Sequence, residues 1–117
     1  MRGVLVVAHG SRREGAHRIF RDMVAEAAGR TGTVVETAFL EFSEETIEQG
    51  LRKLTARKVT QIEVLPYFLF EGVHTREDIQ AELDRFTREN PGARIEMGVV
   101  FGSDPRLTDL LADRIRG

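Results

Sequence analysis

Two hydrophobic patterns alternate along the chain: short continuous apolar runs and longer segments whose apolar residues recur at helical spacing. The first run, residues 3–8, has the length and composition of a strand buried on both faces. Further strands are predicted at 33–40, 60–66 and 95–101, and helices at 15–29, 43–57, 75–89 and 104–115 with their caps included. Strands that alternate with helices predict an α/β fold, with a four-stranded parallel sheet and helices on both faces.

Residues typical of helix starts precede three of the predicted helices. Ser43 is the expected N-cap of the second, and the segment Thr75-Arg76-Glu77-Asp78 matches an acidic variant of the capping box for the third. Asp104 before Pro105 predicts an N-cap followed by proline at the first helical position. No linker or repeat divides the chain, so we expect one domain over residues 1–117.

Two histidines follow predicted strands, where an open parallel sheet binds its ligands. His9 comes directly after the first strand, and His74 closes the segment that follows the third. A flavodoxin-like strand order of 2-1-3-4 would place these two strand ends side by side. Because neutral imidazole is the commonest metal ligand in proteins, a metal site is the first candidate.

The composition of the chain excludes several classes of function. The 117 residues carry a net charge of −2, so no basic field indicates a nucleic-acid partner. The lack of cysteine excludes disulfides, zinc-thiolate sites, iron–sulfur clusters and thiol nucleophiles. The apolar runs are too short to span a membrane, and no signal-peptide pattern is visible, so the expected location is the cytoplasm.

Three further titratable residues need an interpretation, and only that of Glu41 stays open between a structural and a functional role. Glu41 follows the second strand between apolar residues, where it would cap a helix, pair with an arginine, or complete a site with the histidines. Glu71 is expected to be solvated at a loop tip. His17, in the first turns of a predicted helix, is expected to lie on the surface.

Polar residues near predicted helix starts are candidates for anion binding. Ser11, Arg12 and Arg13 precede the first helix, and Arg76 lies at the start of the third. In most proteins such residues lie in solvent-exposed turns and bind nothing. Helix N-termini and guanidinium groups also favour carboxylates and phosphates, however.

Residues 67–73, called the apolar loop below, are more hydrophobic than a solvent-exposed loop requires. Part of the loop could continue the third strand. The remainder, which includes Phe70, Gly72 and Val73, would line a cleft for a flat hydrophobic ligand or form a subunit interface, and neither role excludes the other.

Three segments together resemble the small, single-domain class II tetrapyrrole chelatases, the sirohydrochlorin cobaltochelatase and ferrochelatase group. They are Val-Val-Ala-His-Gly-Ser-Arg at 6–12, Ala-Phe-Leu-Glu-Phe at 38–42, and the long segment at 66–79 that contains the apolar loop. The resemblance implies a chelatase-like half domain. It puts the family's metal-handling histidines on His9 and His74 and its site glutamate on Glu41.

The resemblance further implies a lyase that inserts a divalent metal into sirohydrochlorin, a flat macrocycle with many carboxylates, on a route to cobalamin or siroheme. Co²⁺ is the first expectation, with Fe²⁺ and Ni²⁺ as alternatives and no organic cofactor. The substrate-binding residues would be Ser11, Arg12, Arg13, Phe70, Gly72, Val73 and Arg76. Double-length relatives enclose the macrocycle with two domains, so a homodimer is expected here. Glu71, where a small residue is expected, and Gln80, where proline is expected, depart from the family pattern.

Two other functions stay open at this point. A metal or tetrapyrrole carrier would use the same histidine pair without turnover. A phosphate- or nucleotide-binding module would use Ser11 and the arginines, although the first loop lacks both a Gly-x-Gly-x-x-Gly motif and a Walker lysine. The physiological metal, the pathway, and the choice of proton acceptor among His9, His74 and Glu41 are not fixed by the sequence.

Overall fold

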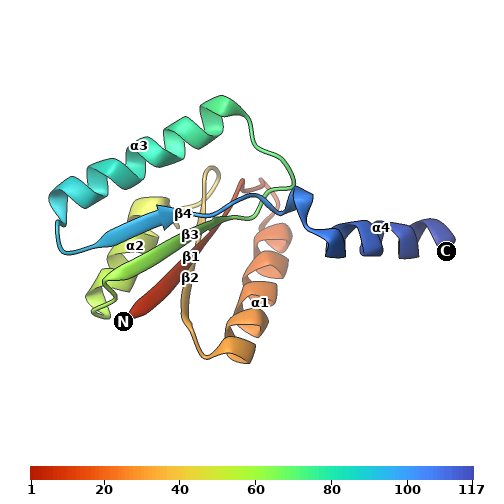
Figure 1. Ribbon diagram of the computed structural model, residues 1–117, viewed down its shortest axis with the longest axis horizontal. Helices are drawn as coiled ribbons and strands as arrows, with labels where there is room; N and C mark the ends of the chain where they lie inside the picture. The colour runs from red at the N-terminus through yellow and green to blue at the C-terminus, as the bar shows by residue number, and fades with distance from the viewer.

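The computed structural model describes residues 1–117 and contains one parallel sheet of four strands (Figure 1). The strands lie in the order β2-β1-β3-β4, and every adjacent pair is parallel. Their bounds are β1 (Arg2–Ala8), β2 (Val34–Phe39), β3 (Gln61–Pro66) and β4 (Arg94–Met97). The predicted fold class is therefore confirmed. The strand order is the flavodoxin-like one, which makes the carboxyl ends of β1 and β3 neighbours.

Four α-helices and one short 3-10 helix connect and follow the strands. Their bounds are α1 (Glu14–Thr31), α2 (Ile47–Ala56), α3 (Val73–Glu89), η1 (Phe101–Ser103) and α4 (Pro105–Arg116). Helix α1 lies on one face of the sheet and α2 and α3 on the other, whereas α4 extends away from the sheet (Figure 1). None of these helices combines the length and apolarity needed to cross a membrane.

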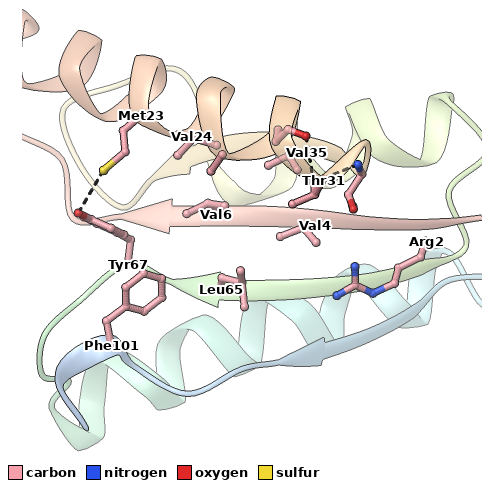
Figure 2. Close-up of a pocket in the computed structure, with 13 residues that line it drawn as sticks. Arg2, Val4, Val6, Met23, Val24, Thr31, Val35, Leu65, Tyr67 and Phe101 are labelled. Atoms are coloured by element: carbon pink, nitrogen blue, oxygen red, sulfur yellow. Dashed lines mark hydrogen bonds between the residues drawn. The ribbon is translucent and has the colours of Figure 1, made fainter. Parts of the chain in front are cut away.

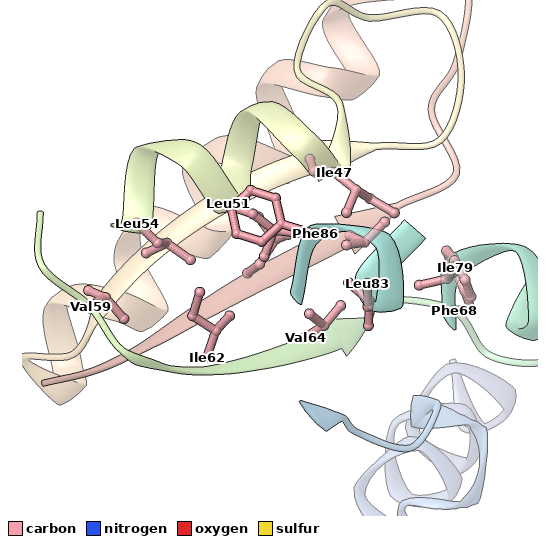
Figure 3. Close-up of a cluster of buried hydrophobic side chains, with 13 residues drawn as sticks. Ile47, Leu51, Leu54, Val59, Ile62, Val64, Phe68, Ile79, Leu83 and Phe86 are labelled. Carbon is pink, nitrogen blue, oxygen red and sulfur yellow. The ribbon is translucent and has the colours of Figure 1, made fainter. Parts of the chain in front are cut away.

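Alternate residues of β1 supply both hydrophobic cores. Val4 and Val6 face α1 and its residue Val24 (Figure 2), and they share a buried cluster with Val24 and Phe20. Leu5 and Val7 belong to a larger cluster on the opposite face. Residues of α2 and α3, among them Leu51 and Leu83, cover that cluster (Figure 3). Successive side chains of a strand point to opposite faces, and here both faces are covered by helices. The sequence therefore shows one continuous apolar run rather than an alternation.

Two helices begin at residues other than those predicted. Ser43 accepts a hydrogen bond from the Glu45 backbone N–H and forms a turn, while the N-cap of α2 is Thr46, whose side chain accepts from the N–H of Gln49. The capping box predicted at residues 75–78 is also wrong, because α3 already begins at Val73. The N–H of Arg76 donates to the carbonyl of Gly72, so residues 75–78 already lie within the helix.

Other boundaries also shift by a few residues. Helix α1 continues through Gly29 and ends at Gly32, whose positive φ of 71° forms the left-handed C-cap. Strand β4 ends at Met97 instead of residue 101, since the chain turns into η1 at Phe101. The predicted cap of α4 is confirmed: Asp104 accepts from the Arg106 N–H at 2.9 Å, and hydrogen bonds from Arg106 lower the pKa of Asp104 to about 2.

Candidate functional site at the carboxyl edge of the sheet

His9 lies one residue beyond β1, and its side chain is exposed on one face of the ring and packed against the protein on the other. Its ring stacks on Phe68 with 4.1 Å between the ring centroids and 26° between the planes. Phe68 belongs to the larger core and is itself buried, so it offers a fixed surface to the imidazole. No protein group hydrogen-bonds either ring nitrogen, which leaves both nitrogens available to a ligand.

Backbone hydrogen bonds extend past the ends of β1 and β2 and bring Glu41 beside His9. The N–H of Leu40 donates to the carbonyl of Ala8 and the N–H of Glu41 to that of His9, both at 3.0 Å. Gly10 allows this approach, because a Cβ at its φ of 98° would lie 2.1 Å from the Glu41 carbonyl oxygen. No hydrogen bond or ion pair engages the exposed Glu41 carboxylate, so it serves neither as a helix cap nor as an arginine partner.

His74 is exposed in the first turn of α3. The N-terminus of α3 lies at the edge of the sheet where the strands have their carboxyl ends (Figure 1). Both histidines are therefore at this edge, His9 after β1 and His74 on the helix that follows β3. The structure contains no group of three or more His, Asp or Glu side chains that could hold a metal ion.

Three of the residues predicted to bind carboxylates, Ser11, Arg12 and Arg13, lie in the loop after β1. The Arg12 guanidinium lies over the ring of Phe42, 5.1 Å from its centroid, and this places a cation beside an exposed aromatic residue. Ser11 accepts a hydrogen bond from the Arg13 N–H, and the Arg13 side chain is exposed and unpaired. Phe42 was not among the predicted site residues, because its φ of 59°, unusual for an aromatic residue, is not visible in a sequence pattern.

Glu71 is not solvated as expected. Its side chain is only 18% exposed and accepts a hydrogen bond from Arg76 at 2.8 Å. The other carboxylate oxygen is buried without a hydrogen-bond partner. A buried carboxylate needs a cation, and the arginine one helical turn into α3 supplies it. Arg76 is therefore partly engaged within the protein, although its side chain remains 43% exposed.

The apolar loop divides into a buried part and an exposed part. Phe68 enters the core, whereas Leu69 and Val73 are exposed and Phe70 is 80% exposed. Gly72 is the N-cap of α3 and has no atoms near its missing Cβ. The expected exposed hydrophobic surface is present. It directly precedes His74 in the chain, and His9 contacts the same loop through its stack on Phe68.

His17 is buried, which corrects the expectation of a surface residue. Its Nε2 accepts a hydrogen bond from the Ser11 N–H at 2.8 Å, and its ring stacks on Phe39 at 4.0 Å. His17 precedes Phe20 and Val24 by three and seven positions, the spacing of one helix face, and that spacing was the available signal. His17 thus fixes the loop that carries His9.

Replacement of His17 by alanine is expected to destabilise the fold by about 3 kcal/mol, because it leaves a cavity beside Phe39 and removes the acceptor for the Ser11 N–H. Chemical denaturation measures this change. The exposed neighbour Arg18 provides the matched control, since Arg18→Ala should alter the unfolding free energy by less than about 0.5 kcal/mol. Equal stability of the two variants would contradict the role assigned to His17.

An ion-pair network connects α1 with the loop that carries Glu41. Arg21 donates to Glu45 at 2.7 Å and to Glu14 at 2.9 Å, and Thr37 donates to Glu45 at 3.0 Å. Burial raises the pKa of Glu45, but the hydrogen bonds from Arg21 and Thr37 outweigh it and lower the pKa below its ordinary value of 4.5. The network therefore requires an ionised Glu45.

Acid is expected to weaken this network. A carboxyl with a lowered folded pKa stabilises the fold fully above its unfolded pKa, near 4.5, and loses that contribution as the pH falls through the folded value. Unfolding free energies measured from neutral pH downward should therefore fall less steeply for Glu45→Gln than for the wild type. Glu44→Gln, at the exposed adjacent position, should retain the wild-type slope. Equal slopes for all three proteins would exclude this contribution of Glu45.

Comparison with known proteins finds relatives in sequence and in fold. A model of the CbiX family matches residues 3–117. A sirohydrochlorin ferrochelatase from Priestia megaterium is 33% identical over 98% of this chain, which spans 44% of that relative. A sirohydrochlorin cobaltochelatase from Methanopyrus kandleri is 30% identical, with 99% of this chain and 96% of the relative covered.

A solved structure gives the same result at the level of the fold. The crystal structure of the sirohydrochlorin chelatase SirB from Bacillus subtilis subspecies spizizenii in complex with cobalt superposes with a TM-score of 0.90 and 29% identity. The superposition covers 98% of this chain and 50% of SirB. The chain therefore spans about half the length of some relatives and nearly the whole length of others.

Proposed function

The chain belongs to the CbiX family, and on that basis we propose that it is a chelatase that inserts a divalent metal ion into sirohydrochlorin. One observation carries the proposal: the exposed imidazole of His9 stacks on a buried aromatic ring at the carboxyl edge of the sheet, and its backbone is hydrogen-bonded to Glu41, whose carboxylate has no protein partner. The relatives named sirohydrochlorin ferrochelatase and cobaltochelatase support the choice of substrate.

The proposed residues supply the two functions that metal insertion requires. His9 and His74 receive the metal ion from water, because imidazole binds Co²⁺, Fe²⁺ and Ni²⁺ without the tight affinity of thiolates. Two pyrrole N–H protons must leave as the metal enters, and His9, His74 and Glu41 are the acceptors at this edge. We propose Co²⁺ as the preferred metal, with Fe²⁺ and Ni²⁺ as the competing substrates.

The macrocycle would be held through its carboxylates and its flat face. Ser11, Arg12, Arg13 and Arg76 offer hydrogen-bond donors and positive charge to the carboxylates. Phe70, Gly72 and Val73 offer an exposed apolar surface to the ring. One such surface covers one face of a macrocycle, and we propose that a second copy of the chain covers the other in a homodimer.

An anaerobic absorbance assay of sirohydrochlorin with Co²⁺, Fe²⁺ or Ni²⁺ tests the proposal. We expect the protein to accelerate metallation above the rate without protein, most strongly for Co²⁺. Exposed Gln61→Ala, at the opposite end of β3, is the matched control and should retain the rate. Absence of acceleration with any metal, despite stoichiometric binding of metal or macrocycle, would instead indicate a carrier.

A further inference from the structure

One hydrogen bond joins residues 69–71 of the apolar loop to the rest of the protein, and it comes from a side chain. No backbone N–H or carbonyl of these residues takes part in a hydrogen bond. The Glu71 carboxylate accepts from Nη1 of Arg76, near the start of α3, at 2.8 Å. Phe70, directly before Glu71, is 80% exposed. The pair of Glu71 and Arg76 therefore fixes an exposed segment to the start of α3.

The Glu71–Arg76 pair uses only part of what its two groups offer. An arginine and a carboxylate pair best through two parallel hydrogen bonds, but here one Glu71 oxygen accepts and the other is buried without a partner. Arg76 engages one of its several N–H donors, and its side chain is 43% exposed. Arg76 thus keeps free donors on a partly exposed side chain, while its single positive charge is already paired with a carboxylate of its own chain.

Arg76 lies beside the surface proposed for the flat face of the macrocycle. It follows Val73 by three positions, so the two residues are neighbours on one side of α3. Val73 is 72% exposed, and the exposed Phe70 precedes it in the same loop. A tetrapyrrole ring that lies on these two residues would bring a carboxylate from its rim to the Arg76 guanidinium, the group that Glu71 already engages.

We propose that the Glu71 carboxylate competes with a carboxylate of the macrocycle for Arg76 and thereby limits the affinity for both substrate and product. A carboxylate that approaches Arg76 must either displace Glu71 or share one positive charge with it. Displacement is feasible because residues 69–71 have no backbone hydrogen bonds to break, so Glu71 can turn into water. The inference rests on the proposed function, since it takes Arg76 as a group that binds the substrate.

The chemistry of metal insertion gives such a competitor a role. The metal ion enters at the centre of the macrocycle and leaves the carboxylates on its rim unchanged, so each contact to a carboxylate holds the product as tightly as the substrate. Binding energy that is equal for substrate and product does not accelerate the chemical step, and it slows release. By weakening one of these contacts, Glu71 favours departure of the metallated macrocycle.

Fluorescence titration with metal-free sirohydrochlorin measures the affinity without turnover. Glu71→Ala should lower the dissociation constant about fivefold, the effect of one partly exposed charge, and should lower KM without raising kcat. Glu71→Gln should give a smaller gain, because a neutral amide still accepts from Arg76 but more weakly. Glu77→Ala is the matched control: it removes an exposed carboxylate from α3 that has no ion pair, and should change the dissociation constant by less than about twofold.

A double variant shows whether the gain passes through Arg76. Arg76→Ala alone would leave Glu71 buried without its cation and weaken the fold, so Arg76→Ala is combined with Glu71→Ala, and the tighter binding should then disappear. Unchanged or weaker binding by Glu71→Ala, or a gain that persists in the double variant, would overturn the competition alone. A wild-type protein that does not bind sirohydrochlorin would instead overturn the proposed function, and this inference with it.

Discussion

Replacement of His9 by alanine is expected to lower the rate of metal insertion by about a hundredfold or more, the range for loss of a positioned proton acceptor. The His9 side chain is exposed and touches the core only through its stack on Phe68, so the fold should lose no more than about 1.5 kcal/mol. Anaerobic initial rates, together with unfolding curves, separate these two effects. His74→Ala should also slow insertion without unfolding the protein.

Added imidazole distinguishes a chemical role of His9 from a structural one. In the His9→Ala variant the space above Phe68 is open, and free imidazole should restore part of the rate by replacing the missing ring. The Gln61→Ala protein, altered at the far edge of the sheet, should show no response to imidazole. Full activity of His9→Ala without imidazole would remove His9 from the proposed mechanism.

The substitution Gly10→Ala is expected to have the largest effect on the fold. The residue has a φ of 98°, and a Cβ would lie 2.1 Å from the Glu41 carbonyl oxygen, a backbone atom that cannot move without its loop. Strain at such a position, with the displacement of the Glu41 loop, should destabilise the protein by about 2–4 kcal/mol. The chelatase rate should fall as well, because His9 and Glu41 lose their register.

Gly15 supplies the matched control for Gly10. It lies at the start of α1, and no atom lies within 4 Å of the position its Cβ would take. Gly15→Ala should therefore leave the rate unchanged and stabilise the fold by about 0.5 kcal/mol through helix propensity. If thermal and chemical denaturation show Gly10→Ala to be as stable as Gly15→Ala, then the close approach of the two loops does not position the site.

The strands could be predicted from the sequence because burial on both faces leaves a direct record in composition, whereas their order in the sheet could not. The run at residues 3–8 is apolar throughout and rich in valine, and β1 is an inner strand of the sheet, between β2 and β3. The first residues of the helices were harder to predict from the sequence. Thr46 and Ser43 are both good caps, and only the hydrogen bond from the Gln49 N–H decides between them.

The errors at the site concern groups whose environment depends on tertiary contacts. His17 was expected on the surface because histidine is polar, yet its spacing from Phe20 turns it inward, where it accepts from the Ser11 N–H. Glu71 was expected in solvent, but Arg76 pairs with it across the first turn of α3. Local sequence patterns predict which residues reach the carboxyl edge better than they predict their partners.

The most direct test of the central claim is the number of metallated sirohydrochlorin molecules formed per protein chain at protein concentrations far below that of the substrate. The account predicts many product molecules per wild-type chain and almost none for the His9→Ala/His74→Ala double variant, provided that it retains its circular dichroism spectrum. A wild-type yield that stops at one product per chain would contradict it and would assign the protein to a carrier function.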